Sequence, residues 1–172
     1  MQQLDHGLLA DRIERIEAVL IRSLAFAAGL GIGLGLLLPY LTWSVDQKDV
    51  TSNIVATGFL GVTYRTEDGD IDGPSLFIGI AFIGLSLVGV LALCVLVRVA
   101  ARTGSMSFTR WANAIAALLL IGVVGAWLFA GVARRDSSFA LHSGIFFLTG
   151  GAMLFAFVIF TDTARRWWVL DR

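Results

Sequence analysis

Three aspartates, Asp68, Asp70 and Asp72, stand at alternate positions directly before Gly73 and a long apolar segment. Alternate carboxylates followed by glycine resemble the start of an EF-hand loop, in which they converge on a hard cation. Position 79, which would supply the bidentate glutamate of that loop, is a glycine, so a complete EF-hand is excluded. Two interpretations are left: a surface site for Ca²⁺ or Mg²⁺, or a turn in which Asp72 or Gly73 caps a helix that begins with Pro74.

A second group of polar side chains, Arg134, Arg135 and His142, precedes the last apolar segment. Two guanidinium groups near a histidine would suit a lipid headgroup or a quinone, and the alternative is an interfacial histidine that only forms hydrogen bonds. Ser143 follows His142, but consecutive helical side chains point about 100° apart, which is poor geometry for a nucleophile and its base. His6 and His142 are expected on opposite sides of a membrane, which argues against an intrachain haem. We therefore predict a protein that is not an enzyme and holds no cofactor.

Glycines are concentrated in the apolar sequence GLGIGLG, where Gly29 with Gly33 and Gly31 with Gly35 form two interleaved pairs. Small residues four positions apart let another helix approach closely inside a membrane, where no hydrophobic effect drives helices together. The spacing predicts a tight helix-packing face. It leaves open whether the partner is a helix of the same bundle, a second copy or a foreign helix.

The composition places these residues in a membrane protein. The chain has 172 residues, is 57% hydrophobic and 15% charged, and has a mean hydropathy of +0.81. A helix needs about 20 apolar residues to cross the bilayer core. Four segments without charged residues meet that length: residues 23–43, 75–97, 108–132 and 139–161. We predict an all-α membrane protein, a single domain over residues 1–172 with four transmembrane helices in a bundle, and the uncharged spans argue against an ion-coupled pump.

The charges indicate how the helices are oriented. Positively charged residues accumulate in cytoplasmic loops of membrane proteins. With four spans, the side that holds both termini carries nine of the 13 Lys and Arg residues, and the other side carries four of them with seven of the 13 acids. We predict a multi-pass protein of the bacterial plasma (inner) membrane with both termini in the cytoplasm.

Two segments outside the spans have patterns of their own. Residues 8–22 place Leu9, Ile13, Ile16 and Leu20 on one face, which predicts an amphipathic helix that lies in the headgroup region, extends the first span, or binds a partner. Residues 44–74 form the one sizeable outer loop. Within it, the β-branched and aromatic stretch NIVATGFLGVTYRT followed by EDGD predicts a small β-hairpin that must pack on the helix ends or on another protein.

The order of these elements carries a resemblance. A first helix ending in LPYLTW, the outer segment ATGFLGV and the sequence DGDIDG before the second helix resemble small four-span envelope proteins of actinobacterial type. In outline the chain is also similar to claudin-like tetraspan proteins, which carry a β-rich first outer loop, although it lacks their cysteine pair. The resemblance implies the arrangement of elements and no functional residues.

The sequence therefore predicts a noncatalytic accessory or scaffold subunit of a larger inner-membrane complex, one for envelope-lipid transport, respiration or cell-wall assembly. Its expected partners are the lipid bilayer and other membrane subunits, bound through the amphipathic leader, the outer hairpin or the glycine face, and not nucleic acid. Two alternatives are an oligomeric transporter or channel with its pathway between chains, and a lipid- or quinone-binding subunit of a membrane enzyme.

Overall fold

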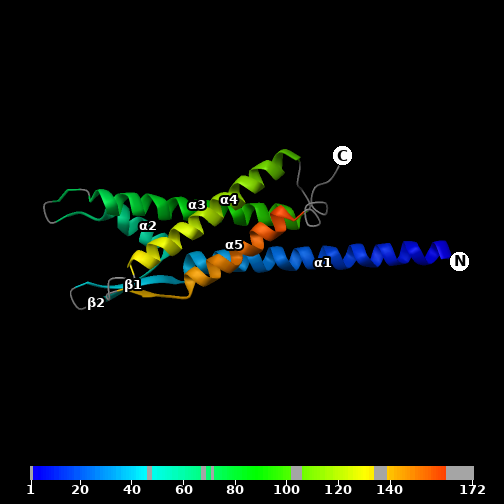
Figure 1. Ribbon diagram of the computed structural model, residues 1–172, viewed down its shortest axis with the longest axis horizontal. Helices are drawn as coiled ribbons and strands as arrows, with labels where there is room; N and C mark the ends of the chain where they lie inside the picture. Colours follow the sequence, from blue (N-terminus) through cyan, green and yellow to red (C-terminus); the bar gives the residue numbers. More distant parts are fainter. Residues whose placement is uncertain are drawn as a thin grey trace.

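The computed structural model describes residues 2–45, 48–66, 69–70, 72–101, 106–133 and 139–161. These ranges are mostly helical and carry a small sheet at one end (Figure 1). The helices are α1 (Gln2–Leu37), α2 (Ile54–Thr63), α3 (Gly73–Ala100), α4 (Met106–Ala133) and α5 (Gly144–Phe160). The strands are β1 (Pro39–Val45), β2 (Lys48–Asn53) and β3 (Phe139–Leu141), which pair antiparallel in the order β2-β1-β3.

Four helices form the bundle. α1 packs against α3 and α5, and α4 packs against the same two helices, so the four enclose one apolar core. Fully buried side chains of that core include Ile32 on α1, Leu119 on α4 and Phe155 on α5. The described part of the chain has three helices long and apolar enough to cross a membrane: Arg12–Leu37 within α1, α3, and Phe108–Ala133 within α4. This arrangement is that expected of a membrane protein.

The first predicted span is shorter than expected at its C-terminal end. α1 ends at Leu37, and residues 39–45, which include the last part of the predicted span, form β1. Pro39 explains the change, because proline has no N–H to donate and disfavours helical geometry in the residue before it. The amphipathic leader is continuous with the span, since α1 runs without a break from Gln2 to Leu37. Figure 1 shows its N-terminal part extending past the other helices.

The outer loop does contain a β-hairpin, but the predicted position was wrong. The hairpin consists of β1 and β2, and the stretch predicted to be β-structure is mostly the helix α2. Asn53 caps this helix, because its Oδ1 accepts the Ala56 N–H at 2.8 Å, while its Nδ2 donates to the Leu37 carbonyl at 3.3 Å. Ile54 has no exposed surface in this helix, and its burial stabilises the fold by roughly 2 kcal/mol. This gain is larger than the preference of a β-branched residue for a strand, so the stretch is helical.

Glycines place α2 against the outer part of α3. A Cβ on Gly61 would lie 2.7 Å from the Gly79 Cα, and a Cβ on Gly58 would lie 2.9 Å from the Ile83 side chain. Both glycines, which lie in the stretch predicted to be a hairpin, are therefore contact points between two helices.

The fourth predicted span divides into two elements. Residues 139–141 form β3, which pairs with β1, and α5 begins only at Gly144 and has 17 residues. The His142 N–H continues the strand pairing by donating to the Tyr40 carbonyl at 3.1 Å. The chain is mostly helical, as predicted, and the connections before α2 and before α5 both contribute to one small sheet.

Candidate functional site

The two glycine pairs of α1 face different neighbours. Gly31 and Gly35 lie against α5: a Cβ on Gly31 would stand 2.7 Å from the Gly151 Cα, and one on Gly35 would meet the Leu148 backbone. Real Cβ atoms do not approach backbone so closely, so these positions accept only glycine without a shift of a helix. α1 and α5 thus form a closed seam of backbone against backbone.

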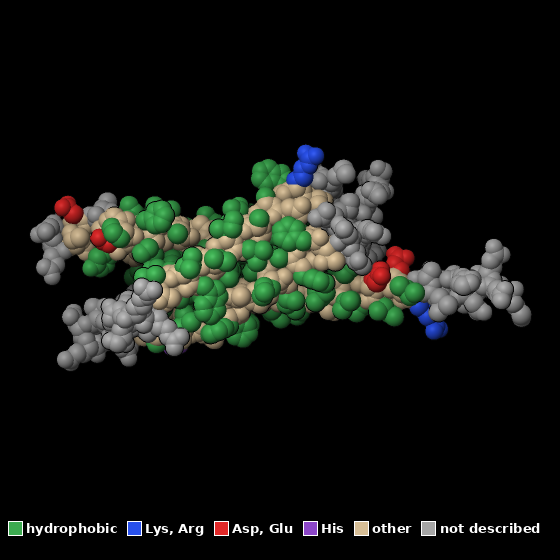
Figure 2. Space-filling view, viewed as in Figure 1, with side chains coloured by type: hydrophobic (Ala, Val, Ile, Leu, Met, Phe, Trp, Pro, Cys, Tyr) green, Lys and Arg blue, Asp and Glu red, His purple; other side chains and the backbone are tan. Residues whose placement is uncertain are grey.

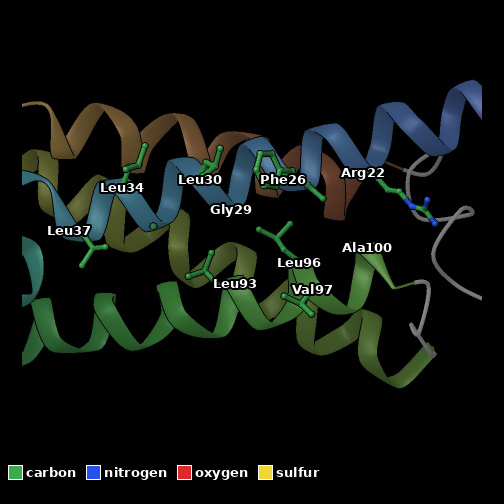
Figure 3. Close-up of a pocket in the computed structure, with 12 residues that line it drawn as sticks. Arg22, Phe26, Gly29, Leu30, Leu34, Leu37, Leu93, Leu96, Val97 and Ala100 are labelled. Atoms are coloured by element: carbon green, nitrogen blue, oxygen red, sulfur yellow. The ribbon is translucent and has the colours of Figure 1, made fainter.

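Gly29 and Gly33 lie on the opposite side of α1, where it borders α3. A Cβ on Gly29 would make ordinary contacts with Leu93 at 3.7 Å and Leu96 at 3.8 Å, and one on Gly33 would meet nothing within 4 Å. The helices leave an apolar groove here, which we name the α1–α3 groove, with a volume of about 480 Å³ (Figure 3). It is the candidate functional site.

Side chains of α1 and α3 form the walls of the groove. In Figure 3, Leu96 projects from α3 towards α1, and Leu37 projects from α1 towards α3 at the other end. Phe26 and Val97 also line the groove and are each 69% exposed. The groove is therefore open along one side to the surroundings of the bundle.

Among the described residues, the one charged side chain that lines this groove is Arg22, at the end away from the sheet. On the face shown in Figure 2, hydrophobic side chains cover the middle of the molecule, while described charged side chains lie towards its two ends. An apolar groove with a guanidinium group at one end can bind an apolar chain that carries an anionic group at its own end. Arginine is suited to that anionic group because it binds phosphate and carboxylate with paired donors.

Tyr40 joins the sheet to the bundle. Its side chain is fully buried, its hydroxyl donates to the Ala126 carbonyl at 2.7 Å, and its ring lies 5.4 Å from the Phe82 ring, centroid to centroid. Burial raises the pKa of the Tyr40 phenol well above its usual value. Tyr40 is therefore a neutral hydrogen-bond donor that holds β1 against α4, and it leaves no reactive phenolate.

His142 has a hydrogen-bonding role in the sheet. Its Nε2 lies 2.7 Å from the Thr42 Oγ1, which lies 2.7 Å from the Thr51 Oγ1 on the next strand. The chain of three groups links β1 to β2 and to the residue after β3. Arg134 and Arg135 lie outside the described residues, so the headgroup or quinone contact stays a prediction.

The acidic stretch forms a turn and a helix cap in the part that the structure describes. The Asp72 carboxylate accepts the Ser75 N–H at 3.0 Å at the start of α3, as the capping interpretation predicts. Hydrogen bonds from the Ser75 hydroxyl and N–H lower the pKa of Asp72. The Thr66 N–H donates to the Asp70 carbonyl at 2.9 Å, and Gly69 has a φ of 83°. Asp68 lies outside the described residues, among which no three His, Cys, Asp or Glu side chains gather to hold a metal ion.

Sequence reasoning missed the α3 side of the groove and the polar chain in the sheet. Gly29 and Gly33 signalled a packing face, but nothing in the spacing showed that Leu93, Leu96 and Val97 would lie opposite it. Thr42 and Thr51 carry no motif, because only the strand register brings them together with His142.

Comparisons of the chain with protein-family models, with curated proteins and with solved structures found no match.

Proposed function

We propose that the chain is a noncatalytic accessory or scaffold subunit of a larger bacterial inner-membrane complex, and that the N-terminal part of α1 binds an amphipathic helix of another subunit. The observation that carries this proposal is the unbroken course of α1. A leader that turned aside at the membrane surface would bury its apolar face in the headgroup region. A leader collinear with a spanning helix instead projects that face away from the bilayer.

The apolar stripe of the leader lies beyond the end of α3. Gly29 is level with Leu93 and Leu96, and α3 ends at Ala100, roughly 6 Å past Leu96. Ile13 to Leu20 lie between roughly 14 and 24 Å from Gly29 in the same direction. The helix α3 therefore ends too early to cover these residues.

The stripe has the form of a helix-binding seam. Ile13, Ile16 and Leu20 follow one another at spacings of three and four, and they are 57%, 68% and 57% exposed. That spacing is typical of the apolar seam of a coiled coil, and the exposed Arg12, Glu14, Arg15 and Glu17 supply both signs of charge beside it. An amphipathic helix with the same pattern is the partner that this surface fits.

The proposal includes four spans with both termini in the cytoplasm. α5 is roughly 26 Å long, at the lower limit for a span, and packs along α1 and α4. Arg22 and Arg98 near one end of the bundle, and Asp70 and Asp72 at the other, support an orientation with the leader in the cytoplasm.

Site-specific photocrosslinking in intact cells tests this function. A photoreactive amino acid at position 13, 16 or 20 should give an adduct of one fixed mass with one integral or membrane-bound subunit. The same group at position 14 should give none, because Glu14 is about 200° around the helix from Ile16. The substitution Ile16→Asp should abolish the adduct from position 20 while the amount of protein in the membrane is unchanged.

Three results would contradict the proposal. Equal adducts at positions 14 and 16 would show random encounters, and an adduct of twice the mass of the chain would show self-association. A chain that leaves the membrane in mild detergent as a lone monomer, with no adduct at any of the three positions, would remove the basis for a complex.

A further inference from the structure

We propose that the α1–α3 groove binds one acyl chain of an anionic phospholipid, with the lipid phosphate at Arg22. This inference is independent of the proposed subunit partner, because the groove lies among the spanning helices and the leader stripe lies beyond them. The groove ends at Arg22 and extends along α1 to Leu37. Its occupant must therefore be apolar over its length and negatively charged at one end.

The dimensions of the groove suit a hydrocarbon chain. From Arg22 to Leu37 the groove is about 22 Å long, and its volume of about 480 Å³ corresponds to a mean cross-section of roughly 22 Å². A methylene chain, whose carbon atoms contact their neighbours at about 4 Å, needs only roughly 15 to 20 Å².

Gly33 is what keeps the groove open in its middle. No atom lies within 4 Å of the position that a Cβ on Gly33 would take, whereas Gly29 is partly covered by Leu93 and Leu96. An acyl chain in the groove would contact the α1 backbone at Gly33 and the side chains of Leu30 and Leu34 beside it. These residues are half exposed in the chain alone.

The preference for one phospholipid over another must come from the lipid headgroup and not from the acyl chain. Other lipid tails are as apolar as the groove, so burial of a chain there gains little over its place in the bilayer. A basic residue beside a gap between spanning helices attracts anionic headgroups, and one arginine near the surface gives a preference of about fivefold. Arg22 is exposed and lines the end of the groove that lies away from the sheet.

The test uses the full chain in vesicles that contain phosphatidylglycerol or phosphatidylcholine probes with a photoreactive group near the end of one acyl chain. Mass spectrometry of the digested protein locates and counts the crosslinks. With the phosphatidylglycerol probe, crosslinks should concentrate on residues 29–37 of α1 and residues 93–97 of α3, about fivefold above the yield with phosphatidylcholine. Crosslinks to Leu118 and Val124, which are exposed on α4, provide the reference for ordinary contact with the bilayer.

Two variants identify the groove and the headgroup contact separately. Gly33→Leu fills the groove with a larger side chain, and nothing lies within 4 Å of its Cβ position. It should lower the number of crosslinks in the groove at least tenfold without changing the number on α4. Gly150→Leu is the matched control, because a Cβ at Gly150 also meets nothing within 4 Å but lies on α5 beside a different surface depression. Leu30 and Leu34 border both depressions, so the two variants are compared by their crosslinks on residues 93–97 of α3. Arg22→Gln should reduce the phosphatidylglycerol yield to that of phosphatidylcholine.

The proposal would be overturned by either of two results. If Gly33→Leu and Gly150→Leu change the groove crosslinks equally, the chain does not occupy the groove. If both lipids label the groove equally and Arg22→Gln has no effect, the headgroup is not recognised. Arg22→Gln replaces an exposed side chain, so it tests headgroup recognition even if Gly33→Leu lowers the yield of folded protein. A crosslink from one copy of the chain to another through residues 29–37, with loss of lipid labelling, would assign the groove to self-association instead.

Discussion

α1 meets its two neighbours in opposite ways. Towards α5 it presents Gly31 and Gly35, and the two backbones approach until no Cβ fits between them. Towards α3 it presents Gly29 and Gly33 at the same spacing, and a groove separates much of the two helices. The two faces differ little in sequence on α1 itself.

The difference comes from the residues opposite. α5 offers Gly151 to Gly31, so small residue meets small residue and the backbones come together. α3 offers Leu93 and Leu96 to Gly29, and these side chains hold the helices apart, so that Gly33 further along α1 is left open. A pair of glycines four positions apart therefore permits close packing, and the opposing helix decides whether it occurs.

The closed seam should be the most sensitive part of the bundle. Gly35→Ala places a methyl group against the Leu148 backbone, which cannot move aside as a flexible side chain can. We expect the free energy of unfolding to fall by about 3 kcal/mol, at the upper end for an overpacked site. Denaturant titration in mixed detergent micelles, followed by tryptophan fluorescence, measures the change. A loss below about 1 kcal/mol would mean that the seam is looser than the structure has it.

The bundle was the predictable part of the fold, because long uncharged segments leave few alternatives. For the segment between α1 and α3, the sequence predicted that a hairpin exists but not where it lies. Asn53, Gly58 and Gly61 fit a hairpin or a helix equally well from local sequence, and the choice depends on Gly79 and Ile83 of α3, which accept a helix there. β3 was missed because three residues at the start of an apolar segment show no strand pattern until β1 lies beside them.

The α1 side of the candidate site could be predicted from the sequence, and the α3 side could not. Gly29 and Gly33 were identified from their spacing, and Arg22 was visible as a charge at the border of the first span. Whether those glycines would be covered depended on the side chains that α3 brings to them, which no pattern within α1 contains. A hydrogen-bonding role was one of the two interpretations of His142, but nothing in the sequence pointed to its partner Thr42, 100 residues away in the chain.

Tyr40 tests how far hydrogen bonding, in addition to close packing, holds the sheet on the bundle. Tyr40→Phe removes the bond to the Ala126 carbonyl and keeps the ring contact with Phe82. We expect a loss of about 1 kcal/mol in the free energy of unfolding, the usual net value for a buried hydrogen bond. Tyr64→Phe is the control, because Tyr64 is 57% exposed, and it should leave stability unchanged. Equal effects from both variants would contradict the anchoring role of Tyr40.

A smaller effect is expected where α4 meets α5. The Trp127 Nε1–H donates to the Thr149 Oγ1 at 2.9 Å, and the Thr149 hydroxyl donates to the Ile145 carbonyl at 2.7 Å. Polar pairs between membrane helices contribute about 0.6 kcal/mol on average. A double-mutant cycle with Thr149→Val and Trp127→Phe should give a coupling energy of that size. A coupling of zero would mean that packing alone joins these helices, as it does along the seam between α1 and α5.

The smallest effect should come from the open face of α1, and it completes the comparison. Gly33→Ala adds the same methyl group as Gly35→Ala, two residues away on the same helix, but in a position where nothing lies within 4 Å. The free energy of unfolding should stay within about 0.5 kcal/mol of the unchanged chain or rise slightly, because alanine favours helix over glycine. The same titration measures both variants. If Gly33→Ala destabilised the chain as much as Gly35→Ala, the groove would have to be closed in the folded protein, and the distinction between the two faces of α1 would fail.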